Sequence, residues 1–265
     1  MRYIRQGIGL ALGIALQAST LTGCASPAKA PDPIFTTGII GALEEEVTEL
    51  KSAMTASTVT EISGMEFCEG ELDGAHVVVV QCNMGKVNAG ICAQTLIREF
   101  HADQIINTGV AGSLDATLDI GDIVVSTDAV QHDYNVEPLG AKPGEMPDMG
   151  VDCFPADEGL RKKAVEAVQA VAPEVKAFEG RVCSGDQFIS THEEKDRITS
   201  TFGGLCCEME GGAIAHVCWR NQTPFVIIRA ISDKADDSEA VDYFTFKQEA
   251  AARCAKIARY IVSHG

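Results

Sequence analysis

The sequence predicts an α/β fold, a three-layer αβα sandwich with a central mixed, partly parallel sheet. Apolar β-type runs alternate with helical patterns from residue 34 onward, and near-continuous Val/Ile runs are typical of strands that are buried on both faces. The chain has 265 residues and is 46% hydrophobic, which suffices for one sizeable core. In such folds, ligands bind beyond the carboxyl ends of the strands. Polar residues that follow the predicted strands are therefore candidates for a functional site.

The first predicted elements are three strands and two helices. Residues 34–42 (IFTTGIIGA) form an apolar run that leads into a Gly turn, and residues 44–53 have a helical pattern. Residues 65–71 and 76–82 (HVVVVQC) have the composition of strands. Residues 86–99 (KVNAGICAQTLIRE) space their apolar side chains by three and four positions, which predicts a helix.

The second part of the chain continues the alternation. Residues 104–108 and 122–128 are expected to be strands, and a helix over 158–171 is expected to end near Pro173. Residues 178–183 form the next predicted strand. The last three predicted elements are a helix, a buried strand (FVIIRAI) and a closing helix, at residues 212–221, 225–231 and 244–263.

Residues 1–23 are expected to be an export signal that takes no part in the fold. Arg2 and Arg5 precede an apolar run at residues 7–16, which is shorter than the roughly 20 residues that a membrane-spanning helix needs. The order of basic, apolar and then small residues is typical of a secretory signal. The segment ends in LTGC, which resembles a bacterial lipobox, so the thiol of Cys24 is the expected lipidation site.

Residues 24–33 are interpreted as a flexible tether, which leaves residues 34–265 as the folded domain. The protein is therefore expected to be exported and anchored to the cell envelope, with membrane contact through the lipid anchor only. A rival cleavage site at residues 28–30 (AKA) is followed by Pro31, which signal peptidases tolerate poorly. The alternative is a cytoplasmic protein that keeps an uncleaved apolar tail.

The composition disfavours nucleic acid as a partner. The formal net charge is −17, and so acidic a surface repels phosphate backbones. The ten cysteines include no C-x-x-C pair and lie mostly in apolar runs. This pattern favours buried free thiols over a disulfide framework.

Polar side chains stand out in four segments that have the pattern of strand ends. The segments are GALEEEV at 41–47, CNMGKV at 82–87, EMEGG at 208–212 and RAISD at 229–233. Glu44 and Glu45 open a helix, where acidic residues complement the helix dipole. Glu208 and Glu210 lie between apolar residues, which disfavours an open surface, and Asp233 directly ends the most apolar strand. Taken singly, each segment also has a purely structural explanation.

Other catalytic and metal-binding signatures are absent from the sequence. The chain has no H-E-x-x-H, no phosphate-binding P-loop and no G-x-S-x-G motif. Its six histidines lack metal-ligand spacing, and His132 with Asp133 is interpreted as a structural hydrogen-bonded pair. No metal and no cofactor are therefore expected.

Seven motifs occur in order along residues 34–265, and they overlap the four segments described above. They are GIIGALEEEV at 38–47, MGKVNAG at 84–90, IINTGVAGSL at 105–114, GDIVVS at 121–126, SGDQFI at 184–189, CEMEGGAIAHVC at 207–218 and PFVIIRAISDKAD at 224–236. Together they resemble the 5′-methylthioadenosine/S-adenosylhomocysteine nucleosidases, which belong to the nucleoside phosphorylase superfamily. The resemblance implies a nucleoside phosphorylase-like fold and hydrolysis of an N-glycosidic bond, with adenine and a 5′-thioribose as products.

The resemblance also implies three central roles. Asp233 would be the general acid that protonates adenine N7, and Glu46 the general base that activates a water nucleophile. Glu210 would accept hydrogen bonds from the ribose 2′ and 3′ hydroxyls. This division matches the chemistry, because C–N cleavage builds negative charge on the base and positive charge on the sugar.

Other residues are expected to shape the site by the same resemblance. Glu208 and Arg229 would shape the water site. Met209 would pack against the ribose face, and Ser232 would orient Asp233.

The remaining implied contacts concern adenine and the 5′ substituent. Phe188 would pack on adenine, and the backbone of Ile189 would bind the adenine edge. Phe246 would line the alkylthio pocket, which Met146 and Pro147 of the second subunit of a homodimer would close.

Two departures from the family pattern are visible. Many relatives carry Ser where Cys82 stands near the water, and Cys is the weaker hydrogen-bond donor. The loop at residues 139–143 (LGAKP) lacks the aromatic residues that are common there, which leaves the preferred 5′ substituent open.

Three alternatives remain open from the sequence. A nucleoside phosphorylase would need cationic groups for phosphate, whereas the first loop offers Glu44, Glu45 and Glu46 and no Arg. A nucleosidase for another purine nucleoside, such as futalosine, would use the same chemistry. A non-catalytic surface lipoprotein that binds host or matrix molecules is the third.

Overall fold

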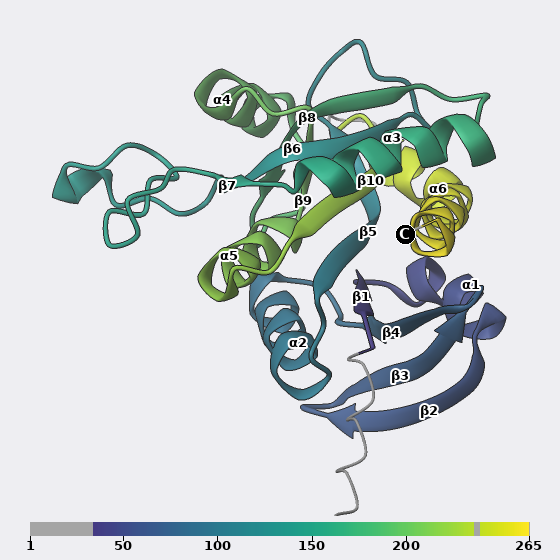
Figure 1. The fold of residues 1–265 in the computed structure, drawn as a ribbon. Helices are drawn as coiled ribbons and strands as arrows, with labels where there is room; N and C mark the ends of the chain where they lie inside the picture. The colour runs from purple at the N-terminus through teal and green to yellow at the C-terminus, as the bar shows by residue number, and fades with distance from the viewer. Residues whose placement is uncertain (1–33, 236–238, 265) are drawn as a thin grey trace, which may run out of the picture. The chain divides into compact units, whose positions relative to one another are not determined.

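The computed structural model describes residues 34–235 and 239–264 of the chain (Figure 1). The predicted signal peptide at residues 1–23, the tether at residues 24–33 and the lipidation of Cys24 lie outside the described residues and stay predictions. Within the described part, no helix is both long and apolar enough to cross a membrane.

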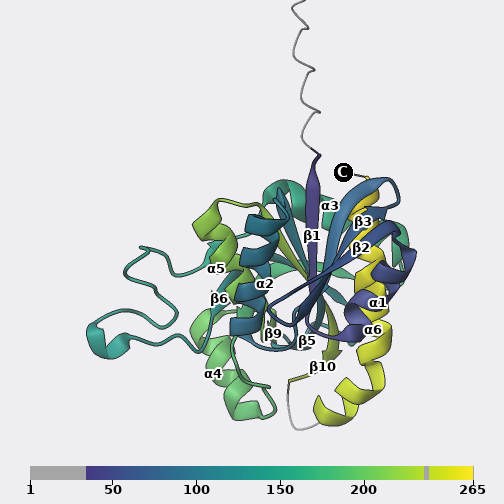
Figure 2. The same cartoon turned by 90° about the horizontal axis from the view of Figure 1, so that it is seen from below.

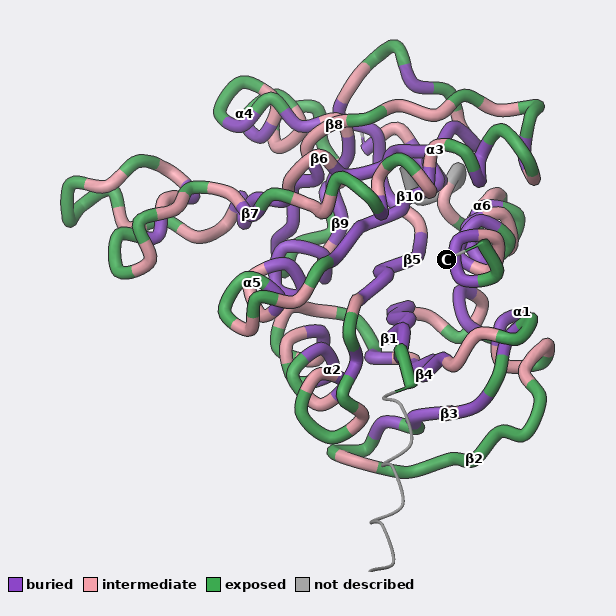
Figure 3. Tube along the Cα trace, viewed as in Figure 1, coloured by how far each residue is buried: buried purple, intermediate pink, exposed green. Residues whose placement is uncertain are grey.

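A mixed sheet forms the centre of the domain, as the sequence predicts. Four parallel strands make up its middle, in the order β4 (Ala75–Gln81), β1 (Thr36–Gly41), β5 (Gln104–Ser113) and β10 (Phe225–Asp233). Both β1 and β10 are buried along their full length, and Figure 3 shows this inner part of the sheet as buried. This burial is typical of parallel strands that are covered on both faces.

Five of the strands close into a ring. β6 (Ile123–Gln131) runs antiparallel to β10 and parallel to β8 (Ala177–Ser184), and β9 (Cys206–Glu208) pairs with both β8 and β5. Because β5 also pairs with β10, the hydrogen bonding returns to the strand from which it started. The ring brings β9 beside the carboxyl end of β5, where the predicted site residues lie.

The helices cover the sheet in two separate groups (Figures 1 and 2). On one face, α6 (Glu239–Ser263) packs against α1 (Glu44–Ala53) and α3 (Glu158–Val171). On the other face, α2 (Lys86–Glu99) packs against α5 (Gly211–Asn221). The predicted three-layer α/β architecture is therefore confirmed.

Five elements of the structure were not predicted from the sequence. They are β2 (Thr55–Ile62), the 3₁₀ helix η1 (Glu137–Leu139), the two-residue β7 (Phe154–Pro155), α4 (His192–Phe202) and β9. β2 pairs only with β3 (Met65–Leu72) at the edge of the sheet, and it is exposed at every position except Ile62 (Figure 3). An exposed strand has no alternation of apolar and polar residues, so its sequence lacks the pattern that predicts a strand.

Several predicted boundaries also change, and three of these changes bear on the site. β5 continues to Ser113, five residues beyond its predicted end. β10 continues to Asp233, two residues beyond the predicted end, so the predicted acid belongs to the strand itself. The closing helix begins at Glu239 and not at residue 244. The nine described cysteines are free thiols and are buried, apart from the half-buried Cys153.

Candidate active site

A cleft of about 570 Å³ opens beside the carboxyl ends of β5 and β10. Its lining includes eight of the residues that the sequence analysis proposed, namely Glu46, Phe188, Ile189, Glu208, Met209, Glu210, Ser232 and Asp233. Chain segments that are far apart in the sequence thus contribute to one cleft.

Glu46 lies in the first turn of α1 and points back toward the end of β1. Its Oε2 accepts hydrogen bonds from the backbone N–H groups of Ala42 (2.6 Å) and Leu43 (3.0 Å), and its Oε1 accepts from Val110 N–H (3.0 Å). Burial raises the pKa of Glu46, while the charge of Arg229 and the three backbone donors act against this shift. The carboxylate is therefore held in one orientation before any ligand binds.

Gly109 allows Glu46 and Arg229 to approach β5 closely. A Cβ atom at this position would lie 2.5 Å from Arg229 Nη1 and 2.6 Å from Glu46 Oε1. No side chain fits such a space without moving one of the two charged groups. This glycine of the INTGVAG segment is thus required by the site and not by a turn.

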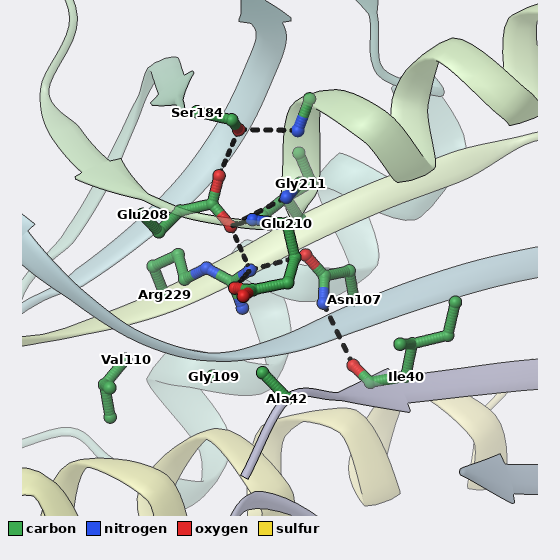
Figure 4. A network of polar contacts seen from close by, with 12 residues as sticks. Ile40, Ala42, Asn107, Gly109, Val110, Ser184, Glu208, Glu210, Gly211 and Arg229 are labelled. Carbon is green, nitrogen blue, oxygen red and sulfur yellow. Dashed lines mark hydrogen bonds and ion pairs between the residues drawn. The ribbon is translucent and has the colours of Figure 1, made fainter. Parts of the chain in front are cut away.

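Arg229 is the centre of a buried polar network (Figure 4). Its Nη2 donates to Asn107 Oδ1 (2.6 Å) and to Glu208 Oε2, and Asn107 Nδ2 donates to the carbonyl of Ile40 (3.0 Å). Arg229 Nη2 also lies 4.0 Å from Glu210 Oε2. The guanidinium is therefore the counter-charge of Glu208, with Glu210 close by, and Asn107 ties it to β1.

Glu208 is the most extensively bonded of the glutamates. Besides Arg229, it accepts hydrogen bonds from the Ser184 hydroxyl and from the N–H groups of Glu210 (3.0 Å) and Gly211 (2.7 Å). Burial acts to raise the pKa of Glu208, but Arg229 and these donors outweigh it and lower the pKa. Glu208 is thus an ionised partner of Arg229.

Glu210 has fewer partners and a different ionisation. Its Oε1 accepts from Gly85 N–H (2.8 Å), at the start of α2. Burial and the charge of Glu208 raise the pKa of Glu210 to about 8, although Arg229 and Gly85 act in the opposite direction. We call Glu46, Glu208, Glu210 and Arg229 the carboxylate cluster.

Asp233 lies at the end of β10 and is 3% exposed. Its Oδ2 accepts a hydrogen bond from the Ser232 hydroxyl (2.8 Å), and its Oδ1 accepts from Ala235 N–H (2.9 Å). A Cβ atom at Gly112 would lie 2.7 Å from Asp233 Oδ1. The Ser232 contact is the one that the sequence analysis expected.

Comparison with known proteins places the chain in a family. Residues 36–263 match the model of the Phosphorylase superfamily. A 5′-methylthioadenosine/S-adenosylhomocysteine nucleosidase of Shewanella loihica is 39% identical over 228 residues, which cover 86% of this chain and 98% of the relative. The chain belongs to this nucleosidase family, within the phosphorylase superfamily. A Staphylococcus aureus nucleosidase of the same description is 37% identical over 227 residues, 85% of this chain and 98% of that one.

Solved structures agree with this family. The Neisseria meningitidis nucleosidase in complex with methylthio-immucillin-A superposes with a TM-score of 0.84 at 36% identity, covering 88% of this chain and all (100%) of that one. The futalosine hydrolase of Helicobacter pylori superposes with a TM-score of 0.83 at 29% identity, covering 88% of this chain and 99% of that one. The fold is therefore shared by enzymes of two described specificities.

The aromatic side of the cleft differs from the expectation drawn from the nucleosidase family. Phe246 does not line the cleft. It lines a separate hollow with Ile120 and Arg253, whereas Tyr243 lines the cleft. The Tyr243 ring packs edge-on against Phe188, with 5.6 Å between the ring centroids. The two positions are three residues apart on α6 and lie on neighbouring parts of one helix face, about 4.5 Å apart along the axis, yet their rings line different hollows.

Three other residues expected near the substrate from the family resemblance lie outside the lining of the cleft. Cys82 is fully buried and lies outside the lining of the cleft, where its thiol donates to the carbonyl of Asn83 (3.1 Å). Met146 is buried in the core of its own chain, and Pro147 is exposed. Their contact with a second subunit stays a prediction.

The expected hydrogen bond between His132 and Asp133 does not form. Both ring nitrogens of His132 are buried without a hydrogen-bond partner in the described structure, and Asp133 instead pairs with Lys86. Burial lowers the pKa of His132, which keeps the ring neutral. Among the described residues, no three His, Cys, Asp or Glu side chains are grouped to hold a metal ion.

Proposed function

We propose that this chain hydrolyses the N-glycosidic bond of 5′-methylthioadenosine and S-adenosylhomocysteine, and releases adenine and the 5′-thioribose. The observation that carries the proposal is that Glu46 and Asp233 both line the cleft at the carboxyl ends of β5 and β10. Glu46 accepts a hydrogen bond from Val110 N–H, and Asp233 Oδ1 lies beside Gly112, so a candidate base and a candidate acid reach one cleft from different elements. Cleavage of a glycosidic bond by water needs such a pair of carboxyl groups.

In the proposed mechanism, each carboxyl group acts on one part of the reaction. Asp233 protonates N7 of adenine, so that the base leaves as a neutral molecule. Glu46 accepts a proton from the water that attacks the anomeric carbon. Glu210 accepts hydrogen bonds from the ribose hydroxyls, and in its ionised form it supports the positive charge that develops on the sugar.

Water is favoured over phosphate as the nucleophile by the charges of the cleft. The described lining carries four acidic side chains and no Lys, Arg or His. Arg229 lies behind this surface and is already bound to Glu208. A phosphate dianion would meet carboxylates and find no free cationic donor, since strong phosphate binding relies on such donors.

Adenine release from 5′-methylthioadenosine, with and without phosphate, tests the proposal. We expect the same rate in both buffers, with the 5-methylthioribose sugar as the second product. A rate that depends on phosphate, with a sugar 1-phosphate as product, would identify a phosphorylase. No adenine release in either buffer would reject the reaction altogether.

A second candidate function is hydrolysis of futalosine. The similarity to the Helicobacter pylori futalosine hydrolase supports its inclusion. A panel of 5′-methylthioadenosine, S-adenosylhomocysteine, adenosine and futalosine, compared by kcat/KM, separates the two specificities. The nucleoside with the highest kcat/KM identifies the substrate class.

The functional unit that we propose is a homodimer. Exposed apolar side chains lie just before α2 and in its first two turns, with 59% of Met84, 73% of Val87 and 41% of Ile91 accessible, and Met84 also lines the cleft. Apolar side chains at such spacing are suited to burial against another protein surface. Sedimentation of the wild type and of Val87→Glu tests this: we expect a dimer for the wild type and a shift to monomer for the variant.

The proposed location is the cell envelope, with Cys24 as the lipid-bearing residue. The support is the order of basic, apolar and small residues before Cys24. Metabolic labelling with a fatty acid tests it. Label on the wild type and none on Cys24→Ser supports the anchor, and an unlabelled wild type rejects it.

A further inference from the structure

The start of α2 is held by two carboxylates that come from other elements. The N-cap residue is Gly85, which has no side chain, and the first turn of α2 contains no acidic residue. Instead, Gly85 N–H donates to Glu210 (2.8 Å) and Lys86 N–H donates to Asp186 Oδ1 (2.7 Å). Two adjacent backbone donors therefore bind one residue of the carboxylate cluster and one residue outside it.

Asp186 is itself held in place by a closed set of polar contacts. Its N–H donates to Asp133 Oδ2 (2.9 Å), and Asp133 Oδ1 accepts from Lys86 Nζ (2.5 Å). Lys86 Nζ also donates to Gln131 Oε1 (3.1 Å). The side chains of Lys86 and Asp133 are only 17% and 20% exposed, so solvent screens their ion pair less than it screens a surface pair. Lys86 thus binds this pair of aspartates through both its backbone and its side chain.

These contacts fix the direction of the Gly85 N–H. Gly85 has a φ of +99°, a backbone conformation that favours glycine, and a Cβ atom there would lie 3.3 Å from Asp186 Oδ1. Gly85 directly precedes Lys86 in the chain. The hydrogen bond that anchors the Lys86 N–H to Asp186 therefore also restrains the neighbouring Gly85 N–H. Glu210 has few other donors, because Arg229 lies 4.0 Å from its second oxygen. The orientation of Glu210 consequently depends on the start of α2.

We propose that Asp186, together with Asp133 and Lys86, is a positioning group for the sugar. By anchoring the start of α2, it directs the Gly85 N–H at Glu210 and so sets this carboxylate to receive the ribose hydroxyls. The inference rests on the proposed nucleosidase function. Asp186 itself lies outside the lining of the cleft and is a positioning residue, not a catalytic one.

The proposal has a consequence for pH dependence. Gly85 N–H is one of the groups that lower the pKa of Glu210 against burial and the charge of Glu208. The charged groups near it are Glu208, Arg229 and Glu46, and substitution of Asp186 leaves all three in place. Loss of the Gly85 contact therefore moves the acidic limb of the kcat/KM profile to higher pH.

The experiment compares Asp186→Ala with Asp186→Asn on two substrates. We expect Asp186→Ala to lower kcat/KM for 5′-methylthioadenosine about tenfold, as for loss of one hydrogen bond to a charged group. The loss should be about threefold or less for the 3′-deoxy analogue, since this substrate lacks one hydroxyl that Glu210 would bind. Asp186→Asn should retain most activity, because its amide oxygen still accepts from Lys86 N–H. Equal losses on both substrates would overturn the proposal and indicate a general structural effect.

A control and a second measurement separate this inference from the proposed function. Asp73→Ala removes an exposed ion pair with Arg259, outside the lining of the cleft, and should leave kcat/KM unchanged for both substrates. Amide hydrogen exchange at Gly85, followed by NMR, should become faster in Asp186→Ala and also in Glu210→Ala. If the wild type released no adenine, the proposed function would fail, and the exchange measurement would still test the anchoring. Unchanged exchange at Gly85 in Asp186→Ala would reject the anchoring itself.

Discussion

The carboxylate cluster and the aromatic side of the same cleft are built in different ways. Glu46, Glu208 and Glu210 are at most 8% exposed, and backbone N–H groups hold each of them. On the aromatic side, Phe188 is 49% exposed, and the described contact of its ring is an edge-on one with Tyr243. The cluster is thus ordered by directional bonds before substrate arrives, whereas the aromatic side relies on apolar packing. Substitutions in the cluster should therefore change charge and chemistry, and substitutions on the aromatic side should change fit.

The largest expected effect in this comparison is the loss of the proposed base. Glu46→Gln keeps the shape of the side chain but cannot accept a proton from water, so kcat should fall by about 10²- to 10⁴-fold. The neighbouring Glu45→Gln is the matched control, because Glu45 pairs with Lys247 and lies outside the lining of the cleft. Steady-state adenine release measures both. If Glu46→Gln stayed within a few-fold of the wild type, Glu46 would not be the base.

The second effect concerns stability and not turnover. Arg229→Met leaves the ionised Glu208 buried without its counter-charge, and removing one partner of a buried pair costs about 3–5 kcal/mol. Arg259→Met removes an exposed partner of Asp73 and should cost less than about 1 kcal/mol. Urea unfolding at neutral pH measures both free energies. Similar losses for the two variants would show that the cluster is not a strongly coupled buried network.

The third effect is the pH dependence that Glu210 gives to stability. Its pKa is raised from an ordinary 4.5 to about 8 in the folded protein, chiefly by burial and Glu208. Folding therefore favours the protonated form, and the stabilisation is complete below pH 4.5 and is lost as the pH rises through 8. Glu210→Gln cannot ionise, so its free energy of unfolding relative to the wild type should rise by on the order of 5 kcal/mol between pH 4.5 and 9. A constant difference between the two proteins over this range would contradict the raised pKa.

The comparison also shows which parts of the site the sequence could predict. Glu46, Glu210 and Asp233 are identified by the resemblance of their motifs to the nucleosidase family, and the local pattern of acidic residues at strand ends and helix starts agrees with it but does not single them out. Asn107 lies inside the β5 run and Ser184 at the end of β8, and nothing in their local sequence distinguishes them from other polar residues of buried strands. Their roles come from contacts with residues that are more than 20 positions away in the chain. A single sequence contains no measure of such contacts.

The fold was predictable to a similar degree and for a similar reason. Strands buried on both faces, such as β10, and amphipathic helices, such as α2, carry periodic patterns that depend only on local burial. β2 is exposed and β9 has three residues, so neither shows a pattern. The closing of five strands into a ring follows from β9 and from the pairing of β5 with β10, both of which are long-range. Local periodicity therefore predicts the layers but not the ring.

The smallest effect tests the aromatic side, where the sequence and the structure disagree. The family resemblance implies that Phe246 lines the 5′ pocket. In the structure, Tyr243 lines the cleft, and Phe246 lines a separate hollow. Tyr243→Ala should raise KM about tenfold for S-adenosylhomocysteine, because loss of an aromatic wall removes apolar contact worth roughly 1.4 kcal/mol or more. Tyr243→Phe should keep this contact and stay close to the wild type.

Phe246→Ala is the variant that decides between the two assignments. Since its ring faces another hollow, we expect KM for S-adenosylhomocysteine to change less than about twofold, although the protein should lose some stability because the half-buried ring packs there. If Phe246→Ala raised KM as much as Tyr243→Ala, α6 would have to turn on binding and bring both rings to the substrate. The aromatic side would then be an induced fit, in contrast to the preformed carboxylate cluster. Equal kcat for all three variants, with changes only in KM, would show that this side of the cleft contributes to binding and not to chemistry.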